Sequence, residues 1–252
     1  MSDPLAYSVA LDFPPAPPTD FRMDRHYLLY ASAGAMRLTH EGRSWTLPPA
    51  RAALIAAQTR IQVTITTALT CRSVLFAPRL TDPPPGPLRV FEMSPLARAL
   101  VMECGQWSNP EGTLPTYAEQ MFKALAQATW KLAETPSPAV MPIPRDARLA
   151  QAMDLTETQI AGTPVFDDIA AQVALSPRSL ARRFADEMGM TWRQTLRRLR
   201  MIRAIEALAG DPKRPVTDVA LSVGYSSISA FNAAFREFTG MTPTEYRASF
   251  DT

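Results

Sequence analysis

The stretch that decides the fold is residues 166–191, FDDIAAQVALSPRSLARRFADEMGMT, together with residues 216–247, VTDVALSVGYSSISAFNAAFREFTGMTPTEYR, which repeat it imperfectly. Ile169 and Ala170 recur fifty residues later as Val219 and Ala220. The Gly-Met-Thr triplet that starts at Gly189 recurs fifty-one residues later, so one residue is inserted within the second copy. Two copies are too few for a solenoid, and the repeat therefore predicts a duplicated supersecondary unit.

Each copy has the pattern of a short helix, a tight turn and a second, capped helix. A small residue in the first helix lets another helix approach, and an apolar residue three positions later stays buried. A serine after the turn, Ser176 or Ser226, is placed to cap the second helix. Apolar residues four apart then form the buried face of that helix. They are Leu180 and Phe184, and Phe231 and Phe235. This is a helix-turn-helix, whose second helix can enter the major groove of DNA.

The net charge hides a local basic segment. The whole chain has 26 basic and 24 acidic residues, a formal charge of +2 that gives no reason to expect a nucleic acid. Residues 178–203, however, carry eight arginines against only Asp186 and Glu187, a net +6. Two local acids cannot pair eight arginines, so this segment favours neutralisation of DNA phosphates and readout of guanine. The arginines are Arg178, Arg182, Arg183, Arg193, Arg197, Arg198, Arg200 and Arg203.

The predicted linker between the two units is one helix, residues 192–209, whose apolar positions recur three and four apart. At 1.5 Å per residue it is roughly 27 Å long. A rod of that length holds two recognition helices near one turn of DNA apart, on the same side of the duplex.

Residues 166–247 closely resemble the DNA-binding domain of the AraC/XylS family of bacterial transcription regulators. Val223-Gly224-Tyr225-Ser226 and Thr242-Pro243 in the second copy carry much of this resemblance. It implies that both recognition helices contact DNA. The first helix would contribute Arg178, Ser179 and Arg182, and the second Ser227, Ser229, Asn232 and Arg236.

Two positions depart from the family pattern. Ala174 occupies the first turn, where many relatives have glycine, and Ala233 stands where arginine is common. We therefore expect the first unit to dominate specificity, while the second acts largely through phosphate contacts and DNA shape.

The N-terminal part reads as β structure over residues 26–92, with short segments about ten residues apart, as in a small antiparallel barrel or sandwich. Residues 26–34 and 45–49 resemble the cupin-type sensor barrel of the same family. The six segments are residues 26–30, 35–39, 43–47, 52–57, 61–66 and 71–77. We expect an α+β multidomain chain. A sensor and dimerisation domain would span 1–135, with its barrel at about 20–92 and helices at about 94–134. A Pro-rich linker would span 136–144, and an all-α DNA-binding domain 145–252, with helix-turn-helix units at about 166–189 and 216–240.

The helix predicted at 116–134 starts at a capping box, Thr116 to Glu119. Its apolar face is Phe122, Leu125, Thr129 and Leu132. That face either packs on the barrel or pairs with its twin in a second subunit, and the sequence does not separate the two. The homodimer expected for this chain would form through this helix.

A ligand-responsive transcription regulator is the leading hypothesis, with promoter DNA, a small-molecule effector and RNA polymerase as partners and with no cofactor. A regulator controlled by protein contacts alone stays open. A cupin metal oxygenase usually needs two or three His and a carboxylate, which His26, His40 and Glu41 do not easily supply. A DNA-alkyl-transfer repair protein needs a reactive or zinc-bound cysteine set, and Cys71 and Cys104 lack such spacing.

The effector site is not assigned by the sequence. Five polar residues of the barrel could line a pocket, where the arginines among them would suit an anionic effector, but each is expected more often on the surface or in packing. They are Arg37, Trp45, Gln58, Arg60 and Arg72. Because no signal peptide and no long apolar run are present, we expect no membrane association and a cytoplasmic location.

Overall fold

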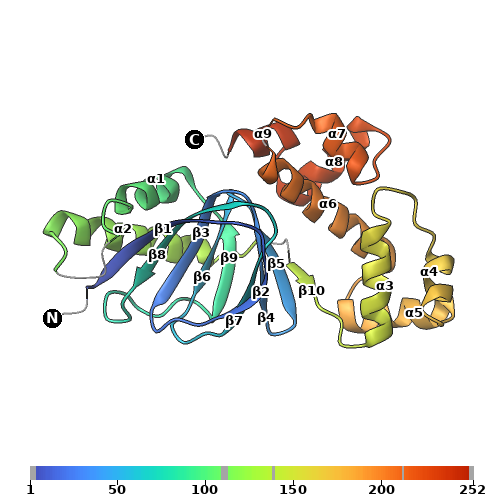
Figure 1. Ribbon diagram of the computed structural model, residues 1–252, viewed down its shortest axis with the longest axis horizontal. Helices are drawn as coiled ribbons and strands as arrows, with labels where there is room; N and C mark the ends of the chain where they lie inside the picture. The colour runs from blue at the N-terminus through green and yellow to red at the C-terminus, as the bar shows by residue number, and fades with distance from the viewer. Residues whose placement is uncertain (1–3, 109–112, 138–139, 212, 250–252) are drawn as a thin grey trace. The chain divides into compact units, whose positions relative to one another are not determined.

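The structure, a computed structural model, describes residues 4–108, 113–137, 140–211 and 213–249. The chain divides into two compact units (Figure 1). Unit 1 comprises residues 1–40, 45–138 and 249–252, and unit 2 comprises residues 41–44 and 139–248. Unit 2 therefore contains both predicted helix-turn-helix units, together with residues 41–44 at the start of the fifth strand.

Two antiparallel five-stranded sheets form the β part of the chain, in the orders β1-β8-β3-β6-β9 and β10-β5-β4-β7-β2. Their facing sides enclose an apolar core that includes Leu29, Met36, Leu38 and Ile61. The strands are β1 Ala6–Phe13, β2 Ala16–Phe21, β3 His26–Ala33, β4 Met36–His40, β5 Arg43–Leu47, β6 Arg51–Ile55, β7 Ile61–Ile65, β8 Leu69–Phe76, β9 Leu88–Glu92 and β10 Val140–Pro142.

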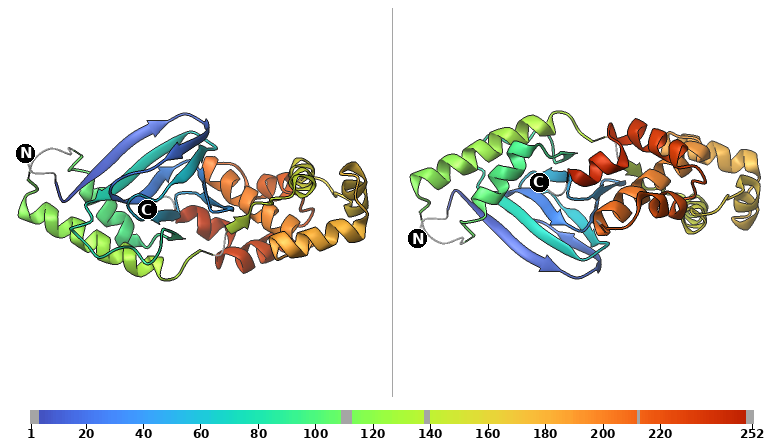
Figure 2. Two further views of the ribbon diagram at one scale, coloured as in Figure 1. Left: turned by 90° about the horizontal axis from the view of Figure 1, so that it is seen from below. Right: turned by 90° about the horizontal axis from the view of Figure 1, so that it is seen from above.

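Helices α1 Pro95–Cys104 and α2 Thr116–Ala133 cover the outer side of the first sheet, as the two views of Figure 2 show. Ser94 caps α1 by accepting a hydrogen bond from the Ala97 amide, and proline stands at the first turn. Thr116 does not cap α2, because the helix already begins at that residue and the cap position is Pro115.

The apolar face of α2 is used within unit 1. Phe122, Leu125 and Thr129 are fully buried, and the first two belong to the core between the helices and the sheet. Of the two alternatives left by the sequence, packing against the β domain is therefore the one that the structure supports for this face. Pairing with a second subunit would need another side of the helix.

Two strands precede the first one predicted. β1 and β2 occupy residues 6–21, where prolines at 14–18 argued against regular structure. β2 tolerates Pro17 and Pro18 because it is an edge strand whose pairing with β7 is irregular between Ala16 and Thr19. The six segments predicted from the sequence correspond to β3–β8, whereas β9 was also not predicted as a strand.

Unit 2 is helical after β10. Its elements are α3 Ala147–Thr158, α4 Phe166–Gln172, α5 Pro177–Arg183, a π-helical turn Phe184–Met188, α6 Trp192–Gly210, α7 Val216–Ser222, α8 Ile228–Thr239 and α9 Pro243–Ala248. They form two helix-turn-helix units, α4–α5 and α7–α8, joined by α6, as the repeat predicted. None of the helices in the described part of the chain is both long enough and apolar enough to cross a membrane.

Each helix-turn-helix unit has its own apolar centre. Leu180 and Phe184 are fully buried in a core that α3, α4 and α6 share, and Trp192 of α6 donates its indole N–H to Thr156 of α3 at 3.0 Å. In the second unit, Phe231, Phe235 and Tyr246 form a chain of ring contacts with centroids 5.4–5.7 Å apart. These centres fix the buried side of α5 and α8, so that the other side faces solvent.

Candidate nucleic-acid interface

The first recognition helix, α5, is held by its cap and presents its basic side chains to solvent. The hydroxyl oxygen of Ser176 accepts a hydrogen bond from the Ser179 amide at 3.2 Å, as predicted for an N-cap. Leu180 points into the core, whereas Arg178 and Arg182 are exposed. Because Arg178 and Arg182 lie four positions apart, they share one face of the helix.

The second recognition helix, α8, is capped by Ser227 and not by Ser226. Ser227 accepts a hydrogen bond from the Ala230 amide at 3.3 Å. Ser227 lies fifty-one residues after Ser176, so the inserted residue of the second copy precedes the cap instead of following it. Ser227 therefore stands at the start of α8, and its hydroxyl group already accepts the capping hydrogen bond from the Ala230 amide.

The other residues expected on α8 differ in exposure. Ser229 and Arg236 are exposed, but Asn232 is only half-exposed and its Oδ1 atom is buried without a hydrogen-bond partner. Ala233, on the exposed side, offers only a methyl group. The polar surface of α8 is therefore sparser than that of α5.

The turns of both units need a left-handed backbone. Ala174 has φ of +53° in the first turn, and Gly224 has φ of +81° in the second. Such a conformation costs a non-glycine residue about 1–2 kcal/mol because Cβ approaches the backbone. Ala174 thus adopts a left-handed turn conformation without a glycine, and its carbonyl accepts a hydrogen bond from Arg148 at 3.2 Å.

Replacing Ala174 with glycine should raise the free energy of unfolding of unit 2 by about 1 kcal/mol, because the strain at φ of +53° is released. Urea denaturation followed by circular dichroism measures the change. Ala171→Gly, at an exposed position of α4 three residues earlier, is the control and should lower stability by up to about 1 kcal/mol. If both substitutions lowered the free energy of unfolding equally, the conclusion that the backbone of Ala174 is strained would be refuted.

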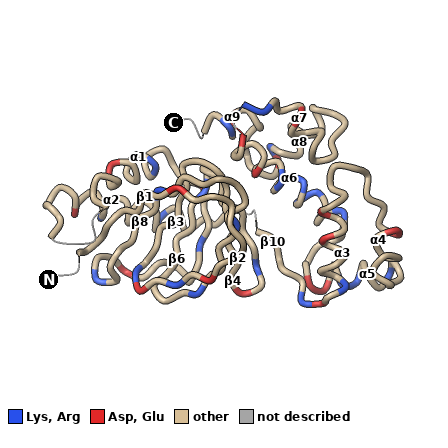
Figure 3. The backbone as a smooth tube through the Cα atoms, in the orientation of Figure 1, with Lys and Arg blue, Asp and Glu red and all other residues tan. Residues whose placement is uncertain are grey.

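Most arginines of the basic segment have partners inside unit 2. Figure 3 shows basic residues along α6, but several of them contact acids or rings from distant parts of the sequence. Arg197 pairs with Glu237 at 2.5 Å, and Arg203 bridges Glu157 and Glu206. Among the described residues no ion pair or side-chain hydrogen bond is formed by Arg178, Arg182 or Arg193.

Two further arginines of the basic segment pack against aromatic rings, so fewer of its eight arginines are available to contact DNA. Arg198 lies over the Phe238 ring and Arg200 over the Tyr225 ring, at 5.9 and 5.7 Å from the centroids. Burial lowers the pKa of both guanidinium groups. The expectation that local acids alone would limit pairing was therefore wrong, because the paired acids, Asp146, Glu157, Glu206 and Glu237, all lie outside residues 178–203. The unpaired charge concentrates on Arg178, Arg182 and Arg193.

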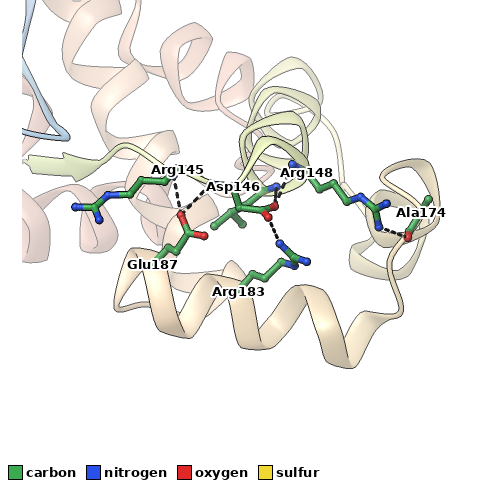
Figure 4. Close-up of polar contacts among 7 residues, drawn as sticks. Arg145, Asp146, Arg148, Ala174, Arg183 and Glu187 are labelled. Carbon is green, nitrogen blue, oxygen red and sulfur yellow. Dashed lines mark hydrogen bonds and ion pairs between the residues drawn. The ribbon is translucent and has the colours of Figure 1, made fainter.

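A polar network ties the start of unit 2 to the first recognition helix (Figure 4). Asp146 caps α3 by accepting hydrogen bonds from the Arg148 and Leu149 amides, and its carboxylate also pairs with Arg183, the last residue of α5. Glu187 accepts hydrogen bonds from the backbone amides of Arg145 and Asp146 at 2.7 and 3.2 Å. With the bond from Arg148 to the turn carbonyl, these contacts hold α5 at both ends.

The Asp146→Asn substitution should remove the ion pair to Arg183 while keeping an N-cap acceptor. Hydrogen bonds, first from the Leu149 amide and then from Arg183, lower the pKa of Asp146. A carboxylate with a lowered folded pKa stabilises the fold above its unfolded pKa and loses that contribution as the pH falls through the folded value. The variant should therefore have a lower melting temperature at neutral pH, and the difference should shrink below about pH 4. A constant difference down to about pH 2 would contradict this account.

The chemistry considered for the enzyme alternatives is not assembled in the structure. Within the described ranges no cluster of three or more His, Cys, Asp or Glu side chains has a geometry that could hold a metal ion. Cys71 and Cys104 are both buried, and burial raises the pKa of both thiols, that of Cys104 to about 12. His26 is occupied within the β domain, where its Nδ1 atom accepts a hydrogen bond from the Ala57 amide at 3.0 Å.

The comparisons with known proteins agree with this geometry. Residues 169–249 match the family model described as "Helix-turn-helix domain". The HTH-type transcriptional regulator NimR of Escherichia coli is 28% identical over 230 residues, which are 89% of this chain and 80% of NimR. The HTH-type transcriptional regulator VqsM of Pseudomonas aeruginosa is 41% identical over 81 residues, which are 32% of this chain and 24% of VqsM.

A solved structure is also similar to the C-terminal part. It is a transcriptional regulator from Chromobacterium violaceum, described among AraC-type DNA-binding domain-containing proteins. It has 31% sequence identity and a TM-score of 0.39, and the alignment covers 41% of this chain and 91% of that one.

The paired helix-turn-helix units and the relatives together define a DNA-binding transcription regulator. The region that matches the family model, residues 169–249, resembles the DNA-binding domain of the AraC/XylS family of bacterial transcription regulators.

Proposed function

We propose that the chain binds promoter DNA sequence-specifically through both recognition helices, in the cytoplasm and without catalysing a reaction. The observation that carries the proposal is the pair of capped helices, α5 and α8, each with one side buried and the other exposed, at the two ends of α6. Helices presented in this way fit successive major grooves on one side of a duplex. The similarity to transcription regulators supports the same proposal.

The residues of α5 are proposed to read bases. Arg178 and Arg182 are exposed and unpaired within the described residues, so their guanidinium groups are available for bidentate contacts to guanine. Ser179 is half-exposed between them and would contact a neighbouring phosphate or base. Arg193, at the start of α6, was not singled out from the sequence. It lines the same surface hollow as Ala181 of α5 and would contact a phosphate.

The residues of α8 are proposed to contribute fewer base contacts. Ser229 and Arg236 face solvent and would contact DNA, while Ser227 would do so from its capping position. Asn232 would contribute only after a rotation that exposes its buried Oδ1 atom. This distribution supports the expectation that the first unit supplies most of the sequence preference.

In vitro selection tests this proposal directly. The purified full chain is incubated with a pool of random duplexes, and the bound DNA is amplified and sequenced over several rounds. We expect a single enriched motif with two parts. A pool that retains its random composition while protein-bound DNA is recovered would overturn the proposal of sequence-specific binding.

Unit 1 is proposed to regulate DNA binding by accepting a small molecule between its two sheets and by forming a homodimer. The dimer would use the exposed side of α2, where Tyr117 is 54% exposed, with Leu96 and Met102 of the neighbouring α1. Sedimentation equilibrium of the full chain tests the dimer. RNA polymerase is the further partner that a promoter-bound activator would contact.

A further inference from the structure

A cavity of about 310 Å³ lies between the two sheets of unit 1. Its size falls at the lower end of the range for small-molecule sites in proteins, about 300–1,000 Å³. Strands of both sheets contribute to its wall. The lining residues are Phe13, Ala16, Pro17, Thr19, Phe21, Tyr27, Leu29, Met36, Val63, Ile65, Leu69 and Cys71.

The wall of this cavity carries no charged side chain among its lining residues. The arginines considered for an anionic effector are not part of it. Arg37 stands between Met36 and Leu38, which belong to the core between the sheets, so it projects from the opposite face of β4. Because a buried charge without a partner costs several kcal/mol, a ligand that bears one would be excluded from this wall.

One polar spot interrupts the apolar wall. It consists of Tyr27 and Cys71, which both line the cavity. The Sγ atom of Cys71 lies 3.0 Å from the hydroxyl oxygen of Ser73, which is fully buried behind the wall and hydrogen-bonds with the Tyr30 backbone. Burial raises the pKa of Tyr27 and of Cys71, so both groups keep their protons at neutral pH. The spot therefore offers neutral donors and acceptors on one side of the cavity, which suits one polar group of a ligand.

The segment that contains β1 and β2 forms the outer wall of the cavity. Phe13 is 37% exposed, and Ala16, Pro17 and Thr19 belong to the irregular edge strand β2. A ligand in the cavity would contact this segment from inside, where the strand makes fewer regular hydrogen bonds than its neighbours. The entry path is expected here because edge strands with irregular pairing are the least constrained parts of a sheet.

We propose that this cavity is the effector site and that it takes an uncharged, mainly apolar small molecule with one polar group directed at Tyr27 and Cys71. The proposal rests on the proposed function of unit 1 as a sensor. It narrows the effector to neutral molecules and excludes carboxylates, phosphates and other anions.

A matched pair of fluorescent probes tests the charge preference. N-phenyl-1-naphthylamine is neutral, and 8-anilinonaphthalene-1-sulfonate has the same rings with one sulfonate added. Each is titrated into the full chain while probe emission is recorded. We expect saturable binding of the neutral probe at one site per chain and at least about tenfold weaker binding of the sulfonate, a difference of about 1.4 kcal/mol.

Substitutions on β7 locate the probe. Val63→Phe fills the cavity and should weaken binding of the neutral probe at least about tenfold, or about 1.4 kcal/mol. Thr64→Phe adds the same ring to the other face of the same strand and should leave binding within about twofold, or about 0.4 kcal/mol. Ile65→Phe repeats the test if Val63→Phe does not fold, as judged by thermal melting.

Three outcomes would overturn the proposal: no binding of the neutral probe, equal binding of the two probes, or unchanged binding by both cavity-filling variants. The same samples are titrated with the selected DNA by fluorescence anisotropy. If DNA binding persists while the probe result fails, the cavity assignment fails alone. If the wild-type chain binds no specific DNA, the proposed function of the chain fails instead.

Discussion

Arg182→Ala and Arg178→Ala should each lower the affinity for the selected DNA by about 1–3 kcal/mol, which is about 5- to 150-fold. Both side chains are exposed on one face of α5, and neither forms an ion pair in the described part of the chain. A bidentate contact to guanine is lost completely when the guanidinium group is removed, so discrimination at one base pair should be lost as well.

The control separates base reading from general electrostatics. Arg60→Ala removes an exposed positive charge from unit 1 and should leave DNA affinity within about twofold, or about 0.4 kcal/mol. Ser229→Ala on α8 should cost less than either arginine substitution, because we expect the second unit to read bases weakly. Unchanged affinity of both arginine variants in a fluorescence anisotropy titration would contradict the assignment of α5 as the main reading helix.

Gly224→Ala should lower the free energy of unfolding of unit 2 by about 3 kcal/mol and weaken DNA binding with it. Gly224 has φ of +81°, and a Cβ atom at this position would meet the Ile160 carbonyl oxygen and Arg200 Nη2 at 2.5 Å each. The Arg200 side chain could shift only by leaving the Tyr225 ring, and the carbonyl belongs to the backbone just after α3. The second turn therefore has to move, and α8 moves with it.

Gly240→Ala is the matched control for Gly224→Ala. Gly240 has φ of +80°, but a Cβ atom there would have no neighbour within 4 Å. Its substitution should cost only the backbone strain, about 1 kcal/mol. Urea denaturation followed by circular dichroism at 222 nm measures both variants. Equal losses of stability would show that the contact with Ile160 has no energetic weight, contrary to this prediction.

The helical half of the fold could be predicted from the sequence because its signals are local. Capping serines, apolar residues three and four apart and glycines after the helices all act within one or two turns. The position of Ser227 was the exception, since the sequence alone did not show on which side of the cap the inserted residue lies. The hydrogen bond to the Ala230 amide resolves it.

The electrostatics of the site could not be predicted from the sequence because they depend on long-range packing. Arg183 pairs with Asp146 and Arg197 with Glu237, residues thirty-seven and forty positions away. Counting only the acids within residues 178–203 therefore overestimated the number of arginines that lack an ion pair. The segment still contains the two arginines of α5 whose charge is uncommitted, and these are the ones that the resemblance pointed to.

The proposed effector cavity could be predicted only in part from the sequence. The sequence predicted a β segment at residues 61–66, and Val63 and Ile65 of this segment line the cavity. The sequence did not show which strands face one another, and the prolines of residues 14–18 concealed β2. None of the five polar residues considered from the sequence lines this cavity.

Hydroxyl-radical footprinting of the full chain on its selected DNA shows whether the two recognition helices read successive major grooves. We expect two protected patches on the same face of the duplex, with centres about 10–10.5 base pairs apart. We also expect that Arg182→Ala weakens the patch of the first unit more than the other. A single protected patch, or two patches on opposite faces of the duplex, would contradict this expectation.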